Sequence, residues 1–292
     1  MPSHVHARSG TRALRLALGL VLGFAVVELG ASLLAGSLAL LADAGHMLSD
    51  SLALGLALFA AWLARRPATP ERSFGWRRAE ILAALANALV LVVLGLGIVV
   101  EAVRRLGDPP AVEGGWVLAA GVVGLAVNLL AARILQAAGS GLNVRAALLH
   151  VLADLASSVG VVVAAVVVLA TGWHGADPLA GLLIGLLVLA STVGILRETV
   201  GILLEGVPAG IDSRAVGGAM AAVPGVVDVH DLHIWTITSG FPALSAHVLV
   251  EPKADCHAIR RELELLLDQR FSLTHTTLQV EHAAGLTQIG AR

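Results

Sequence analysis

The stretch GSLALLADAGHMLSDSLALGLALFAAWLA, residues 36–64, places two acids and a histidine inside a run of leucine, alanine and glycine. Asp43, His46 and Asp50 fall within it, and the stretch contains no lysine or arginine. A helix of this length crosses a hydrocarbon core of about 30 Å. Ionisable groups at that depth are costly and usually mark an ion pathway or a proton relay. The stretch therefore predicts a membrane span that carries a functional polar site.

The composition of the whole chain agrees with a membrane protein. Of its 292 residues, 57% are hydrophobic and 14% are charged, and the mean hydropathy is +0.85. Soluble domains average about 25% charged residues. The net charge of −2 gives no reason to expect a nucleic-acid partner, and membrane lipid is the expected surrounding. The single cysteine, Cys256, excludes an intramolecular disulfide framework and a cysteine-based zinc cluster.

Arginine distribution predicts the orientation of six spans. Ten arginines lie in the amino-terminal segment and the second and fourth connections, whereas the other side has only Arg104 and Arg105. This bias favours a cytoplasmic location for both termini. Asp177, which precedes Pro178, is expected to cap the amino terminus of the last span. The spans are expected near residues 14–35, 38–63, 78–103, 114–136, 144–171 and 178–203.

The last part of the chain has a different pattern, with alternating segments and no apolar run long enough to span a membrane. A helix is expected from Asp212, followed by two strands, an amphipathic helix and a third strand. The order α-β-β-α-β predicts a small α+β domain on the cytoplasmic side. The expected domains are a cytoplasmic amino-terminal tail (1–13), a six-helix transmembrane domain (14–204), a linker (205–211) and a cytoplasmic carboxyl-terminal domain (212–292).

Two similar pentads lie on two different spans. HMLSD holds His46 and Asp50, and HVLAD holds His150 and Asp154 at the same spacing. Residues four apart share one face of a helix, and the second and fifth spans are expected to run antiparallel. Two imidazoles and two carboxylates can then converge on one point. Such a donor set suits tetrahedral Zn²⁺, which the sequence predicts as the bound ion.

Several further polar residues lie within the spans. Asp43 fits the same helix face as the pentad and is interpreted as a ligand, a solvated helix-end residue or an ion-entry residue. Glu28 is a candidate for a proton or vestibule role. Asn128, Ser157 and Ser158 are expected to form hydrogen bonds between spans.

The cytoplasmic part has its own cluster of histidines. His230 and His233 point to opposite faces of a strand, so they do not easily serve one mononuclear site. His247 lies on the neighbouring strand and can pair with one of them. Together these residues predict a second metal site. The further members of this cluster are His257, His275, Glu281 and His282.

The chain resembles the cation diffusion facilitator family, in its zinc-transporting branch. The resemblance rests on GSLALLADAGHMLSD, RRAEILAALANA, HVLADLASSVGV, DPLAGLLIGLLV, LLEGVP and HDLHIWTITSGFPALSAHV, and runs from about residue 14 to residue 282. It implies a homodimer of six-span protomers with ferredoxin-like cytoplasmic domains. It also implies metal export from the cytoplasm in exchange for protons. The composition suggests a bacterial source, so the inner membrane is the expected location.

The resemblance also implies roles for particular residues. His46, Asp50, His150 and Asp154 match the family's transport site. In the cytoplasmic domain, four residues match positions that bind zinc in relatives, and His257 matches a further ligand position used in some of them. The chain departs from some relatives in having no histidine-rich connection between the fourth and fifth spans. The four cytoplasmic residues that match zinc-binding positions of relatives are His230, His247, His275 and Glu281.

The ligand chemistry predicts a mechanism and leaves rivals open. Metal binding needs neutral imidazole and ionised carboxylate, so it releases protons and supports antiport without a covalent step. A membrane zinc hydrolase would need a general base, as in His-Glu-x-x-His, but Met47 and Val151 follow the two histidines. A membrane metal sensor would bind metal without transport. The donor set disfavours Mn²⁺ but does not separate Zn²⁺ from Cd²⁺ or Co²⁺.

Overall fold

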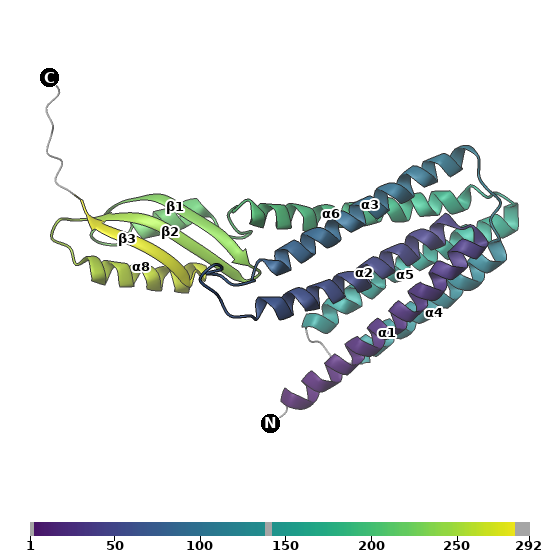
Figure 1. Cartoon of the computed structure of the whole chain (residues 1–292), viewed down its shortest axis with the longest axis horizontal. Helices are drawn as coiled ribbons and strands as arrows, with labels where there is room; N and C mark the ends of the chain where they lie inside the picture. Colours follow the sequence, from purple (N-terminus) through teal and green to yellow (C-terminus); the bar gives the residue numbers. More distant parts are fainter. Residues whose placement is uncertain (1–2, 138–141, 284–292) are drawn as a thin grey trace, which may run out of the picture. The chain divides into compact units, whose positions relative to one another are not determined.

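The computed structural model describes residues 3–137 and 142–283, with side chains described from Arg15 onward except at residues 142–147, 149 and 150. The chain divides into two compact units, one of residues 1–56 and 86–196 and the other of residues 57–85 and 197–292. Figure 1 shows the long helices and the small sheet domain. The elements are α1 (Ser3–Ala35), α2 (Leu38–Ala64), α3 (Ala79–Gly107), α4 (Gly114–Ala137), α5 (Leu142–Thr171), α6 (Ala176–Leu203), α7 (Ser213–Ala221), β1 (Val226–Thr238), β2 (Phe241–Val250), α8 (Cys256–Phe271) and β3 (His275–His282).

Six of the described helices, α1 to α6, are long and apolar enough to cross a membrane. They agree with the six spans expected from the apolar runs. The boundaries differ by more than two residues at two ends: α1 begins at Ser3, ahead of the expected tail boundary, and α3 continues to Gly107. In both places the helix extends beyond its apolar part through residues that include arginines. Apolarity sets the length of a membrane span, whereas a helix continues until its backbone hydrogen bonding ends.

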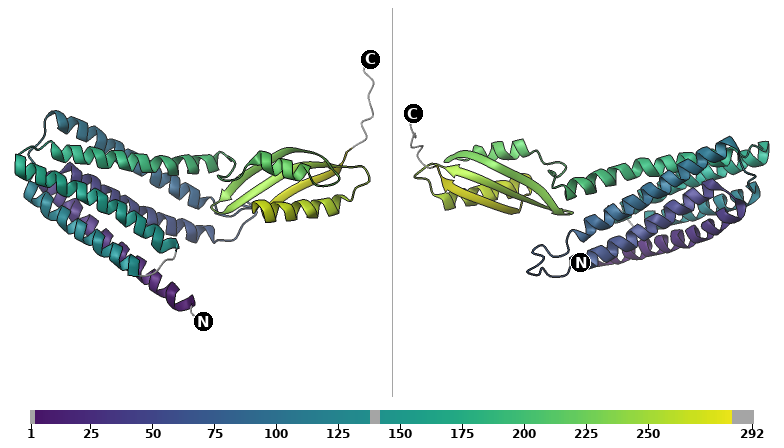
Figure 2. Two further views of the ribbon diagram at one scale, coloured as in Figure 1. Left: turned by 180° about the vertical axis from the view of Figure 1, so that it is seen from behind. Right: turned by 45° about the horizontal axis from the view of Figure 1, so that its top comes forward.

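Glycines bring the helices of the first unit into close contact. A Cβ atom added to Gly95 of α3 would lie 2.8 Å from Cγ of Leu189 on α6. A Cβ at Gly121 of α4 would lie 3.0 Å from Cγ2 of Val162 on α5. In lipid, where apolar burial gives little drive for association, such small residues allow close backbone approach and dispersion contact. Figure 2 shows α1, α4 and α5 side by side in both views.

The expected capping role of Asp177 is wrong. Asp177 lies inside α6, and its carboxylate accepts hydrogen bonds from the amides of Leu38 (2.7 Å) and Ala39 (3.4 Å) and from the hydroxyl of Ser37. It therefore caps α2, a helix distant in the sequence. The first amides of any helix need an acceptor, and here tertiary packing brings Asp177 to the start of α2.

The sheet domain has the expected α-β-β-α-β order. β1 pairs antiparallel with β2, and β2 pairs parallel with β3, giving the strand order β1-β2-β3. α7 and α8 pack on one sheet face, where Met220, Leu244 and Leu263 are fully buried in a single core. Asp212 caps α7, and its side chain accepts from the amides of the first turn, as the sequence predicts. The polar side chains of Ser245 and His247 on β2 and of Thr277 and Gln279 on β3 lie on the other face of the sheet.

Candidate metal transport site

Three of the four predicted transport residues converge between α2 and α5. His46 Nε2 lies 3.4 Å from Asp50 Oδ2 and 3.8 Å from Asp154 Oδ1, and one ligand atom from each residue lies within 4.8 Å of the other two. Asp154 is 2% exposed, whereas His46 and Asp50 are partly accessible. In the described part of the chain, this is the group of His, Cys, Asp and Glu side chains that can share a metal ion.

These separations suit a tetrahedral ion. Zn²⁺ binds imidazole nitrogen and carboxylate oxygen at about 2.0–2.2 Å, which places neighbouring ligand atoms about 3.3–3.6 Å apart. The separations of 3.4 and 3.8 Å in this structure lie close to that distance, and the ligand atoms of Asp50 and Asp154 lie within 4.8 Å of each other. One nitrogen and two oxygen donors also match the preference of zinc-like ions.

His150, the fourth predicted ligand, lies in α5, but its side chain falls outside the described residues. Its share in the site therefore stays a prediction from the repeated pentad.

Close packing fixes the ligand-bearing part of α2. Met47, which follows His46, is 2% exposed and packs with Phe24 and Ala25 of α1. On the other side of His46, a Cβ at Gly45 would lie 3.2 Å from the Leu94 side chain of α3. His46 is thus held on a helix that contacts two neighbours, and its position depends on residues adjacent to it in sequence.

Asp43 is not among the converging ligand atoms but takes part in a network next to them. It accepts hydrogen bonds from the hydroxyls of Ser157 (2.6 Å) and Ser158 (3.4 Å) on α5. Asn128 of α4 donates to Ser158 Oγ at 3.1 Å. The expected hydrogen bonding between spans is confirmed. The sequence did not indicate that Asp43 is the acceptor, although both serines lie one turn after Asp154 on α5.

In the cytoplasmic domain, two of the predicted ligands form a pair. His230 and His247 are partners in the β1–β2 register, and their ring centroids lie 5.5 Å apart. His230 Nδ1 is also hydrogen-bonded to Asp228 Oδ2 at 3.0 Å. The expectation that His247 lies beside one histidine of β1 is confirmed. The expectation that His230 and His233 point to opposite faces of the strand is wrong: a register irregularity between them, with Asp231 at φ 54°, pairs His233 with Ser245, which shares a sheet face with His247.

Among the described residues, the remaining cytoplasmic candidates form no group of three ligand atoms with that pair that could share one ion. His275 and Glu281 lie at opposite ends of β3, about 20 Å apart at 3.3 Å per residue. His275 instead packs against the rings of Phe74 and Phe241, with centroid distances of 6.1 and 5.1 Å. Glu281 accepts a hydrogen bond from Gln279. A strand holds its residues in a line, so sequence proximity does not bring them to one point.

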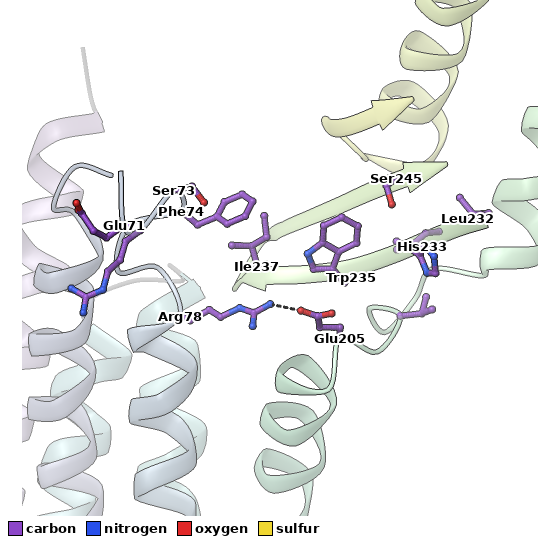
Figure 3. Close-up of a pocket in the computed structure, with 14 residues that line it drawn as sticks. Glu71, Ser73, Phe74, Arg78, Glu205, Leu232, His233, Trp235, Ile237 and Ser245 are labelled. Carbon is purple, nitrogen blue, oxygen red and sulfur yellow. Dashed lines mark hydrogen bonds and ion pairs between the residues drawn. The ribbon is translucent and has the colours of Figure 1, made fainter. Parts of the chain in front are cut away.

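His233 lines a separate cleft of about 900 Å³ within the second unit (Figure 3). Its Nε2 is hydrogen-bonded to Asp231 at 3.0 Å. The ion pair between Arg78 and Glu205, 3.2 Å apart, also borders this cleft. His233 lines this cleft together with Ser245, its partner in the β1–β2 register, on the same sheet face as the His230–His247 pair.

His257 and His282 lie near the start of α8. His257 is exposed in the first turn of α8, and its amide donates to Asp255, the helix cap. Backbone amides of the first turn, chiefly that of Ala258, lower the pKa of Asp255 below its usual value. His282 contacts Cys256 Sγ at 3.4 Å and the Ala254 carbonyl at 3.0 Å.

Comparisons with known proteins cover both parts of the chain. The model of the cation efflux transmembrane domain matches residues 14–204, and that of the cation efflux protein cytoplasmic domain matches residues 208–283. Zinc transporter ZitB of Escherichia coli is 42% identical over 96% of this chain and 90% of its own length. A cadmium, cobalt and zinc/H⁺-K⁺ antiporter of Bacillus subtilis is 40% identical over 91% and 87%. The metal-bound carboxyl-terminal domain of the CzcD transporter of Cupriavidus metallidurans is 38% identical, over 24% of this chain and 99% of that one, with a TM-score of 0.24.

Proposed function

Because the chain belongs to the cation efflux family, we propose that it exports Zn²⁺ from the cytoplasm in exchange for protons. The observation that carries this proposal is the convergence of His46, Asp50 and Asp154 inside the membrane-spanning bundle. His150 completes the proposed donor set. The names of the relatives support zinc as a substrate and antiport as the mode of transport.

The exchange follows from the chemistry of the donors. Loading of Zn²⁺ requires imidazoles without the extra proton and ionised carboxylates, so protons leave as the ion binds. When the site opens to a more acidic exterior, protonation of the same groups weakens their hold on the ion. The driving force is then the proton gradient, and no covalent intermediate is needed. The glycine-lined contacts between the helices suit the helix movements that alternating access requires.

The transport test uses protein reconstituted in liposomes with an imposed pH gradient and a zinc-sensitive dye. Asp50→Ala and His150→Ala are expected to abolish zinc movement while leaving the purified protein folded. Asp108→Ala, which changes an exposed carboxylate outside the site, is the matched control and keeps transport. Undiminished transport by either site variant contradicts the assignment.

The alternative within the same family is an exporter that prefers Cd²⁺ or Co²⁺. The Bacillus relative's name includes both ions, and the donor set binds all three. Competition among these ions in the same liposome assay distinguishes the alternatives. If low concentrations of Cd²⁺ or Co²⁺ block zinc transport, and the same concentrations of Zn²⁺ do not block transport of those ions, the alternative is favoured. Metal binding without any transport would instead favour a sensor.

The wider arrangement is part of the proposal. The matches to the transmembrane and cytoplasmic models support a division near residues 205–211. The arginine distribution supports cytoplasmic termini in a bacterial inner membrane. The protein acts as a homodimer, and its cytoplasmic domain binds Zn²⁺ through the His230–His247 pair. Two imidazoles are fewer than the four donors that zinc usually takes, so further donors complete that site.

A further inference from the structure

An oxygen-lined cluster lies beside the transport site and uses different residues. It joins four helices: Glu28 on α1, Asp43 on α2, Asn128 on α4, and Ser157 and Ser158 on α5. Both carboxyl groups are buried, with Glu28 1% and Asp43 0% exposed. The serine hydroxyls donate to Asp43, and the Asn128 amide donates to Ser158. The cluster thus contains two carboxyl groups, those of Glu28 and Asp43, that are not among the proposed zinc ligands.

Two atoms of this cluster lack a hydrogen-bond partner among the described residues. They are Glu28 Oε2 and Asn128 Oδ1, and their side chains are 1% and 0% exposed. A buried carboxylate oxygen without a partner is costly, and more so within a bilayer. Glu28 faces the charges of Asp43 and, at longer range, Asp154. Ionised Glu28 would therefore meet two negative groups and no hydrogen-bond donor at Oε2.

The hydrogen bonds indicate which carboxyl keeps a proton. Asp43 accepts from two hydroxyls, and such bonds favour its ionised form. Two neighbouring carboxyl groups in a buried site do not both ionise readily, as the paired carboxyls of aspartic proteases illustrate. Of the two carboxyl groups, Glu28 is the better place for a proton, because its buried Oε2 accepts no hydrogen bond. The other charged groups facing this pair are Asp154 and His46.

We propose that Glu28 and Asp43 form a proton-binding site, separate from the metal ligands, which releases its proton when Zn²⁺ occupies the neighbouring site. This inference rests on the proposed transport function. Before metal binds, negative Asp154 opposes a second negative charge on Glu28. A divalent cation held by Asp154 reverses the sign of that field. The O–H bond of Glu28 then breaks, its electron pair stays on the carboxylate, and the proton passes to water on the open side.

The test counts protons released per Zn²⁺ bound. The full chain in detergent is titrated with Zn²⁺ by calorimetry in two buffers that differ in enthalpy of protonation. Glu28→Gln, which keeps the size of the side chain but carries no exchangeable acid proton, is expected to bind Zn²⁺ and release about one proton fewer. The matched control is Glu198→Gln, because Glu198 is an exposed carboxyl on α6, and its proton count equals that of the unaltered chain.

A second measurement follows the carboxyl group itself. The infrared difference spectrum of the unaltered chain is expected to lose a protonated-carboxyl band when Zn²⁺ is added, and Glu28→Gln should lack that change. An unchanged proton count in zinc-bound Glu28→Gln, or no loss of the band in the unaltered chain, overturns the inference and leaves the transport proposal standing. If the unaltered chain binds no Zn²⁺ at all, both proposals fail.

Discussion

The contact between α3 and α6 gives a steric prediction with its own control. A Cβ at Gly95 would lie 2.8 and 2.9 Å from Cγ and Cδ2 of Leu189 and 3.4 Å from the carbonyl oxygen of Gly185. Non-bonded carbon atoms prefer about 3.5–4.0 Å, so Gly95→Ala forces the two helices or the leucine to move. Two residues along the same helix, a Cβ at Gly97 meets no atom within 4 Å.

The magnitude follows from the difference between these two sites. Alanine in place of a helical glycine gains about 0.5–1 kcal/mol in either variant, because less backbone entropy is lost. Gly95→Ala also carries an overpacking cost of about 1–3 kcal/mol. The gain in helix propensity cancels in the comparison. Gly95→Ala is therefore expected to be about 1–3 kcal/mol less stable than Gly97→Ala.

Unfolding by sodium dodecyl sulfate, followed by tryptophan fluorescence, measures this difference. Zinc affinity serves as a second reading and is expected to be the same in both variants, since neither glycine lies at the ligand cluster. If Gly95→Ala proves as stable as Gly97→Ala, the close approach of α3 and α6 is refuted.

Three further predictions concern Asp177, Asp255 and His247. Asp177→Ala removes the acceptor for buried amides of α2 and should cost about 1–3 kcal/mol in the same unfolding assay, whereas exposed Asp108→Ala should change little. The lowered pKa of Asp255 stabilises the folded chain above the usual aspartate value of 3.8, and this contribution disappears as pH falls from 3.8 through the folded-state value. Asp255→Asn should lack that pH dependence. If the difference in unfolding free energy between Asp255→Asn and the unaltered chain does not change with pH, the prediction is wrong. His247→Ala should bind fewer zinc ions per chain in equilibrium dialysis, while transport persists. Thr277→Ala, on the same sheet face, is the control and should bind as many zinc ions as the unaltered chain. If His247→Ala binds as many zinc ions as Thr277→Ala, His247 is not a ligand.

Local pattern in the sequence predicts most of this architecture. The apolar runs locate six long helices because a span must bury about 20 residues in hydrocarbon, whatever its neighbours are. The pentads predict which residues of α2 and α5 share a helix face, and His46, Asp50 and Asp154 do converge. Alternation and capping residues predict the strands and helices of the cytoplasmic domain, including the Asp212 cap.

Contacts between elements cannot be predicted from local pattern, because the helical and strand periods determine the face on which a residue lies and not the residue that it contacts. Only the tertiary structure brings Ser157 to the carboxylate of Asp43 and brings the carboxylate of Asp177, a residue of α6, to the start of α2. The cytoplasmic histidines show the same dependence on tertiary structure. They are numerous in this part of the sequence, but the strand register brings His230 beside His247. The sequence by itself determined the donors and the helices that carry them. The packing of those helices decided which buried charges meet, since a charge in the bilayer is stabilised only by the groups that surround it.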